Sequence, residues 1–275
     1  MSALLPFRFA DPEIPLILVP ATINGQGPHH LLIDTGNGES EPILFRPLAG
    51  ALGLAIHSER AEPGVMGAVR VARARLDCLE VGSVRLSAVE ALVMDELQLP
   101  PVDLRPDGIL GHGFFRDYRL VIDYPRRTLE FTATRDGNDS EGVPISLGSP
   151  KPYVIIDVTV NEGPGRPFLL DTGASATTVS PALAVELGLS VQPTEALGIG
   201  GSMEAGAAVI RRLGAAGLTE RDAQVAVINL FGPVSQAAGR RIEGVLGYPF
   251  LRRCRLEIDY PARRLLLTPV ATGPT

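Results

Sequence analysis

The tripeptide Asp-Thr-Gly occurs twice in the chain, beginning at Asp34 and at Asp171. Three apolar residues precede each copy, Leu-Leu-Ile in the first case and Phe-Leu-Leu in the second. A buried strand that ends in a tight turn would hold each carboxylate rigidly at the strand end. One Asp-Thr-Gly is weak evidence, since it most often forms an ordinary Asx turn. Two copies in equivalent settings predict a working pair of carboxyl groups.

Two carboxyl groups held close together in a partly desolvated site cannot both ionise, and the pair shares a proton. The ionised member can accept a proton from a water molecule, while the protonated member donates a hydrogen bond to a carbonyl oxygen that gains charge. This chemistry hydrolyses an amide bond without a metal ion or a covalent intermediate. Thr35 and Thr172 can hydrogen-bond across to the opposite turn, and Gly36 and Gly173 allow each turn to be tight.

The chain around these turns is an internal duplication. Residues 15–34 align without a gap with residues 152–171, and residues 108–132 align with residues 244–268. About half of the aligned positions in the second block are identical, and the blocks keep their order in each half. Two copies related by a pseudo-two-fold axis would place the two turns face to face.

The rest of the pattern is typical of a mainly β fold. Short apolar or alternating runs punctuated by Gly and Pro predict strands, among them residues 16–23, 119–123, 154–160 and 256–259. Only two stretches resemble short helices, with Pro near the start and Gly near the end: residues 47–54 and 181–189.

A polar segment rich in turn-forming residues, 135–143, separates the two halves. With 275 residues, the chain is long enough for two lobes that each bury a core. We therefore predict a first lobe over residues 1–138 and a second over residues 139–275.

On these residues the chain resembles the retropepsin-like and pepsin-like aspartic proteases, and especially bacterial members with two retropepsin-type units in one chain. In that family a hydrophobic-hydrophobic-Gly element follows the turn, and 109–111 and 245–247 match it. The resemblance covers nearly the whole chain. It implies a bilobal β-barrel fold of the acid-protease type, Asp34 and Asp171 as catalytic residues, a peptide or protein substrate and no cofactor. Because both halves of the pair lie in one chain, we expect a monomer.

The resemblance also implies a Gly-rich hairpin, called the flap, between each turn and its hydrophobic-hydrophobic-Gly element. The candidate substrate-binding residues are Gly64, Met66 and Gly67 in the first half, and Gly198, Ile199, Gly200 and Gly201 in the second. Neither segment contains Tyr, so the retropepsin comparison fits better than the pepsin comparison.

The first turn departs from the family pattern. Asn37 and Gly38 stand where a small residue and Ser or Asp are commoner, whereas the second turn has Ala174. Asn37 can hydrogen-bond the Asp34 carboxylate, or it can mark a lobe that has become structural. The second case predicts a peptide-binding module without catalytic activity.

Other motifs give no competing site. Asp123 and Asp259 are also paired by the repeat, but Pro and Arg follow them, which predicts a hairpin turn. No G-x-S-x-G or H-E-x-x-H motif is present, and the four histidines have no ligand spacing. Residues 198–201 lack the spacing of a nucleotide-binding loop. We therefore expect no metal ion.

Composition narrows the partners further. The net charge is -6 and no basic run occurs, which argues against nucleic acid. No stretch of about 18 apolar residues is present, so we expect no membrane span. The two cysteines, Cys78 and Cys254, suit small buried side chains rather than a disulfide framework. The first residues lack an export signal. We expect a cytoplasmic protein, or a periplasmic one if a longer chain was trimmed.

Overall fold

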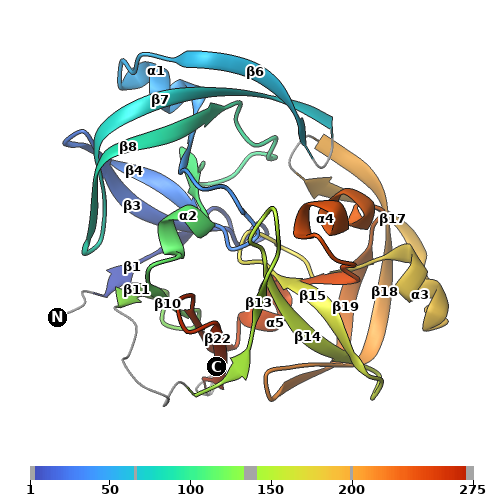
Figure 1. Cartoon of the computed structure of the whole chain (residues 1–275). Helices are drawn as coiled ribbons and strands as arrows, with labels where there is room; N and C mark the ends of the chain where they lie inside the picture. The colour runs from blue at the N-terminus through green and yellow to red at the C-terminus, as the bar shows by residue number, and fades with distance from the viewer. Residues whose placement is uncertain (1–3, 65–66, 133–140, 199–200, 271–275) are drawn as a thin grey trace.

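The computed structural model describes residues 4–64, 67–132, 141–198 and 201–270 (Figure 1). The mainly β, two-barrel fold expected from the sequence is confirmed. The predicted boundary near residue 138 lies outside the described residues and remains a prediction.

The first barrel uses strands from the first half only. They are β2 (Arg8–Phe9), β3 (Ile17–Ile23), β4 (Gln26–Ile33), β5 (Ile43–Phe45), β6 (His57–Gly64), β7 (Gly67–Val81), β8 (Val84–Met94) and β9 (Gly108–Leu110). Their order in the sheet is β2-β3-β4-β9-β5-β8-β7-β6. An additional pairing of β3 with β7 closes six of these strands into a barrel.

The second barrel repeats the first strand for strand. Its strands are β13 (Ser146–Leu147), β14 (Val154–Val160), β15 (Gly165–Leu170), β16 (Thr178–Val179), β17 (Gln192–Gly198), β18 (Gly201–Ala215), β19 (Leu218–Val227) and β20 (Gly244–Leu246). The order β13-β14-β15-β20-β16-β19-β18-β17 matches that of the first barrel, and β14 pairs with β18 to close it. The duplication seen in the sequence is therefore a duplication of the fold.

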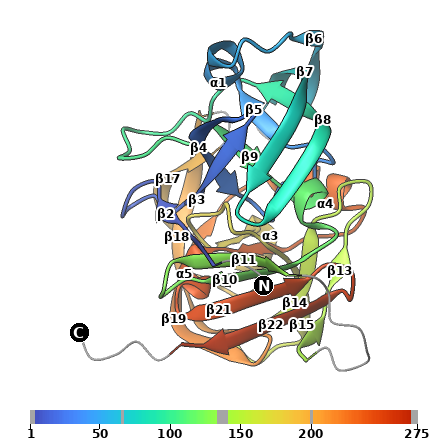
Figure 2. The ribbon, with the colours of Figure 1, turned by 90° about the vertical axis from the view of Figure 1, so that its left-hand side faces the viewer.

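A third sheet joins the two halves, and Figure 2 shows four of its strands, β10, β11, β21 and β22, side by side. Its strands are β1 (Leu5–Pro6), β10 (Arg119–Asp123), β11 (Thr128–Thr132), β12 (Val143–Pro144), β21 (Cys254–Asp259) and β22 (Arg264–Pro269). Their order is β1-β11-β10-β21-β22-β12. At the centre Val121 pairs with Glu257, its own counterpart in the repeat, so the pseudo-two-fold axis passes through this pair. An ion pair between Arg119 and Glu257, 3.4 Å long, also joins the halves.

Local sequence explains the matching hairpins at the start of each barrel. Asn24 and Gly25 have φ of 50° and 77°, which are the values that a tight hairpin turn requires and that Asn and Gly adopt readily. Asn161 occupies the same place in the second barrel, with φ of 48°. The Asn24 side chain accepts the backbone N–H of Asp77 at 2.8 Å, and thus ties this hairpin to β7.

The apolar residues before each Asp-Thr-Gly turn form buried strands, as their sequence predicts. Leu31, Ile33, Phe168 and Leu170 are each 0% exposed and belong to one core that extends through both lobes. β4 pairs in parallel with β9, and β15 with β20, and strands in such pairs are usually buried on both faces.

The helices differ in part from expectation. The two predicted helices are present as α1 (Arg46–Ala51) and α3 (Pro181–Glu186), but three more occur: α2 (His112–Phe115), α4 (Phe231–Ala238) and α5 (Tyr248–Leu251). The expectation of only two helices is therefore wrong. α2 and α5 have four residues each, too few for a helical period to show, and α4 contains Gly232 and Pro233, which favour turns.

The example strands are confirmed, whereas the expectation of buried cysteines holds for Cys254 only. β3, β10, β14 and β21 confirm the four example strands. Both cysteines are free thiols, and Cys254 is fully buried whereas Cys78 is partly exposed. Within the described residues, none of the helices is long and apolar enough to cross a membrane.

Candidate active site

Each Asp-Thr-Gly turn is fixed by the hydrophobic-hydrophobic-Gly element of its own lobe. The backbone N–H of Asp34 donates to the carbonyl oxygen of Leu110 at 3.0 Å, and that of Asp171 donates to Leu246 at 3.1 Å. These bonds extend the parallel pairings β4–β9 and β15–β20 by one residue. The carboxylates therefore stand at the ends of two equivalent, buried strands.

The two turns meet across the pseudo-two-fold axis. A Cβ atom added to Gly36 would lie 2.4 Å from Oδ2 of Asp171, and one added to Gly173 would lie 2.7 Å from Oδ1 of Asp34. Each carboxyl group thus packs directly against the glycine of the opposite turn, where no side chain would fit. Asp34 is only 8% exposed, and Asp171 is partly exposed.

The two threonines lock the turns together through four cross-lobe hydrogen bonds. Thr35 Oγ1 donates to the carbonyl oxygen of Leu170, and Thr172 Oγ1 donates to that of Ile33, both at 2.7 Å. Each threonine N–H donates in turn to Oγ1 of the other, both at 3.1 Å. Both side chains are 2% exposed, so water does not compete for these bonds. The expected contacts across the axis are present.

Burial dominates the electrostatics of the two aspartates. It raises the pKa of Asp34 well above its usual range, and the charge of Asp171 and a hydrogen bond with it raise that pKa further. Burial also raises the pKa of Asp171. Hydrogen bonds from the Gly173 N–H and from Asp34 lower this pKa but do not cancel the effect of burial. The Gly36 and Gly173 N–H groups donate to their own aspartates at 2.8 and 2.7 Å. The pair therefore retains a proton at a pH where an isolated aspartate has lost it.

One hypothesis from the sequence was that the Asn37 side chain hydrogen-bonds the Asp34 carboxylate. In the structure it does not. Its Oδ1 accepts the N–H of Glu39 at 3.0 Å, and its Nδ2 is buried without a partner among the described residues. The side chain packs instead against Gly111, where an added Cβ would lie 2.8 Å from Nδ2. Only the backbone N–H of Asn37 interacts with the Asp34 side chain.

The first turn departs from the family sequence pattern, but its backbone makes the same contact as the backbone of the second turn. The carbonyl oxygen of Asn37 accepts the N–H of His112 at 2.9 Å, and that of Ala174 accepts the N–H of Tyr248, also at 2.9 Å. The unusual side chain has therefore been accommodated without loss of the equivalent contact.

A polar cluster beside the first turn was missed from the sequence. Lys151 Nζ forms an ion pair with Glu39 Oε1 at 2.5 Å, which joins the second lobe to the loop after Gly38. Tyr153 lies against Gly38, and burial, then Glu39 and the two catalytic candidates, raise its pKa to about 12. The counterparts of Lys151, Tyr153 and Glu39 in the repeat are all apolar: Ile14, Leu16 and Ala176. Lys151 is the only lysine of the chain, and this was the one feature of the sequence that could have drawn attention to the cluster.

Both candidate flaps form hairpins. In β6–β7 Gly64 pairs with Gly67, and in β17–β18 Gly198 pairs with Gly201. The other three candidate flap residues, Met66, Ile199 and Gly200, lie outside the described residues.

Asp123 and Asp259 have the predicted structural role. Asp123 Oδ1 accepts the N–H of Arg126 at 3.0 Å, and Asp259 Oδ1 accepts that of Ala262 at 2.9 Å. Each carboxylate thereby closes the hairpin turn that follows β10 or β21. Within the described residues there is no cluster of three His, Cys, Asp or Glu side chains that could hold a metal ion.

Comparison with known proteins identifies the family of the chain. The family model described as Aspartyl protease matches the chain twice, over residues 19–114 and 156–250. Each match contains one Asp-Thr-Gly turn and its hydrophobic-hydrophobic-Gly element. No curated protein sequence matches significantly. Because the two matches cover more than half of the sequence and each corresponds to one barrel, the chain belongs to the aspartyl protease family.

Proposed function

We propose that this protein is an aspartic endopeptidase in which Asp34 and Asp171 together activate a water molecule that hydrolyses a peptide bond held between the lobes. The observation that carries the proposal is the reciprocal packing of each carboxyl group against the glycine of the opposite turn. Family membership supports peptide hydrolysis as the chemistry.

The raised pKa of both aspartates supports a shared proton. The ionised member takes a proton from the water as its oxygen attacks the carbonyl carbon of the substrate. The protonated member donates a hydrogen bond to the carbonyl oxygen as that oxygen becomes negative. When the tetrahedral intermediate collapses, a proton passes from the pair to the leaving nitrogen, and the C–N bond breaks.

The threonine bonds support this mechanism because they fix the distance between the two carboxyl groups. A general acid and a general base must both reach the same water and carbonyl group, and a misplacement of about 1 Å costs roughly a hundredfold in rate. Thr35, Thr172, Gly36 and Gly173 act in this way as positioning residues.

The substrate in this proposal is an extended peptide. Its backbone would pair with the edges of the β6–β7 and β17–β18 hairpins, as an added strand does. The seven candidate flap residues are proposed to contact it. Apolar side chains beside the cleaved bond are expected, and no cofactor is required.

A peptide-binding module without activity is the alternative raised by Asn37. Its carbonyl oxygen makes the same contact in the first turn as that of Ala174 makes in the second, and its side chain accepts the N–H of Glu39 and packs against Gly111. These contacts favour catalysis.

The test is substitution of each aspartate in the full chain. Asp34→Asn and Asp171→Asn should each lower turnover of a denatured protein substrate by at least about 10³-fold, because each removes the shared proton or its acceptor. The double variant should be scarcely worse, since the two groups act as a unit. Asp157→Asn, at an exposed position on β14, is the matched control and should cleave normally.

Circular dichroism should show that all four variants fold. Near-normal cleavage by Asp34→Asn together with loss in Asp171→Asn would assign the first lobe a structural role. Substrate binding without cleavage by the wild-type protein would establish the peptide-binding module.

A further inference from the structure

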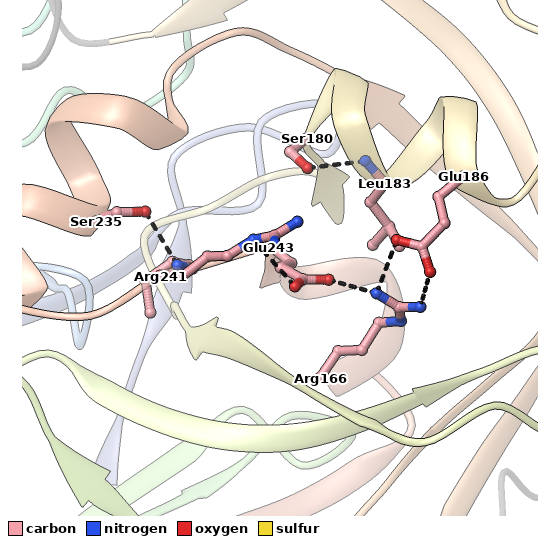
Figure 3. A network of polar contacts seen from close by, with 8 residues as sticks. Arg166, Ser180, Leu183, Glu186, Ser235, Arg241 and Glu243 are labelled. Carbon is pink, nitrogen blue, oxygen red and sulfur yellow. Dashed lines mark hydrogen bonds and ion pairs between the residues drawn. The ribbon is translucent and has the colours of Figure 1, made fainter.

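A hollow of about 410 Å³ lies on the second lobe, apart from the two aspartates. It is lined by the beginning of α3, by α4 and by the segment that enters β20, and the lining includes Ser180, Asn229, Phe231, Ser235, Arg241 and Ile242. Figure 3 shows the polar contacts beside it. Its volume lies within the range of roughly 300–1,000 Å³ that is common for small-molecule sites.

Two serine hydroxyl groups line this hollow. Ser180 Oγ accepts the N–H of Leu183 at 3.1 Å, and Ser235 Oγ accepts the N–H of Ile242 at 2.9 Å. A serine oxygen that accepts in this way keeps its own hydrogen for donation. Ser180 is only 7% exposed, so its hydroxyl is a buried group rather than one freely solvated.

Arg241 adds further donors, held in place by a buried acid (Figure 3). Its Nε binds Glu243 Oε1 at 3.2 Å, and Glu243 is 7% exposed. Glu243 has a second partner in Arg166, at 2.7 Å. The terminal nitrogens of Arg241 are the fork that matches a carboxylate with two parallel hydrogen bonds.

Two apolar side chains, Phe231 and Ile242, form another part of the wall. Phe231 is 6% exposed and Ile242 is 2% exposed, and both belong to one buried cluster of this lobe. A ligand that satisfies such a site carries an acceptor group at one end and a small hydrocarbon group at the other.

The first lobe supplies an internal comparison. Leu44 and Val179 hold the same register place against Gly108 and Gly244, so Phe45 is the counterpart of Ser180. The Phe45 side chain is 2% exposed within an apolar cluster. The duplication has therefore placed a buried hydroxyl in the second lobe where the first has a packed aromatic ring.

We propose that this hollow is a second binding site, for a carboxylate that carries a small apolar group, such as the last residue of a peptide or an N-acylated amino acid. The carboxylate binds Arg241 and the two serine hydroxyls, and the apolar group lies against Phe231 and Ile242. The hollow lies beside the Gly244 end of β20, whereas Leu246 at the other end binds Asp171. Occupancy therefore leaves the aspartates accessible.

The test measures binding of N-acetyl-L-leucine and of a tripeptide ending in leucine to the full chain, by calorimetry and by the shift in unfolding temperature. Each probe is compared with its C-terminal amide. Only the acids should bind, because the amides lack the charge that Arg241 recognises. Arg241→Gln should weaken binding by about tenfold or more. Arg241→Lys should restore part of it.

Arg240→Gln is the matched control, since Arg240 is the exposed neighbour that does not line the hollow. It should bind as the wild type does. The side chain of Arg241 is 67% exposed, so its replacement should not prevent folding. Stronger binding of the tripeptide identifies a peptide end as the ligand, and stronger binding of N-acetyl-leucine identifies a free small acid.

Equal binding by Arg241→Gln and wild type would overturn the proposal, as would equal binding of acids and amides, or no saturation below about 20 mM. These measurements need no turnover. They stand whether or not the aspartates prove catalytic.

Discussion

The proposed chemistry depends on two carboxyl groups whose surroundings oppose ionisation. Burial is the first cause of the raised pKa for both, and their mutual charge adds to it for Asp34. The backbone N–H groups of the turns work in the opposite direction and lower the pKa of both carboxyl groups. In the proposed mechanism a single proton is shared by the pair, and we expect it to influence both activity and stability.

Activity should peak in mildly acidic solution, at roughly pH 4 to 6.5, because one proton must remain on the pair. At lower pH the general base becomes protonated, and at higher pH the general acid is lost. A pH–rate profile with a defined peptide substrate measures both limbs. A rate still rising at about pH 8 would contradict the shared proton.

Stability should respond to the same proton. Because the folded pKa of Asp34 is raised, the native state binds a proton more tightly than the unfolded chain, whose aspartates titrate near pH 3.9. Stability is therefore lost as the pH rises from about 4 through the raised pKa. Asp34→Asn removes this loss.

We expect Asp34→Asn to unfold at a higher temperature than the wild type at pH 7.5, because the variant has no carboxyl group that must ionise inside the fold. The difference should shrink towards pH 4. Calorimetry at both pH values measures it. A gain of the same size at pH 4 and pH 7.5 would mean that the substitution acts through packing instead.

The glycines of the two turns bring the elements together more closely than any other residue would allow. An alanine at Gly173 would place its Cβ 2.7 Å from the Asp34 carboxyl group, across the interface between the turns. Gly173→Ala should cost about 1–3 kcal/mol by overpacking and lower turnover strongly, because the carboxyl groups move apart.

Gly50→Ala is the control for this substitution. Gly50 lies on α1 with open space around its Cα, so alanine should stabilise the helix by up to about 1 kcal/mol and leave activity unchanged. Denaturant unfolding measures both variants. Wild-type turnover by Gly173→Ala would show that the close contact between the turns is not needed.

The equivalent strands β4 and β15 have also diverged, because a proline in β15 lacks the backbone N–H that donates a hydrogen bond in β4. In the first lobe Asp107 accepts the backbone N–H of His30 at 2.7 Å. The counterpart of His30 is Pro167, which has no N–H to donate. Glu243, the counterpart of Asp107, binds Arg166 and Arg241 instead. The acid remains at the start of the strand, but its partners are now side chains.

The strands and the meeting of the two Asp-Thr-Gly turns could be predicted from the sequence because both rest on local pattern and on the repeat. The bridge from Lys151 to Glu39 could not, because it depends on how the two repeats dock, and its counterparts in the repeat are apolar. The buried place of Ser180 was equally hidden, since its counterpart Phe45 shares no chemistry with it. The repeat therefore predicts the features that the two halves share, but not the residues and contacts that occur in one half only.

The two lobes form a single structural unit through the shared sheet. β10 and β21 pair at the pseudo-two-fold axis, and the threonine bonds also cross it. One chain therefore contains the interface that a single-lobe relative would form by dimerising.

We expect the active species to be a monomer. Sedimentation should give one chain of 29.1 kDa, and specific activity should stay constant on dilution. Activity that falls with dilution in step with the dissociation of a dimer would contradict this.

The long-range strand pairings also bear on when activity first arises during synthesis. The backbone N–H of Asp34 donates to Leu110, and that of Asp171 donates to Leu246. Each turn can therefore form this bond only after the ribosome has added about 75 further residues. The threonine bonds need both turns. A nascent chain that has not yet released Leu246 therefore contains neither a locked second turn nor a completed pair of carboxyl groups. On the proposed function, the order of translation therefore delays cleavage until the strand that contains Leu246 has been made and folded.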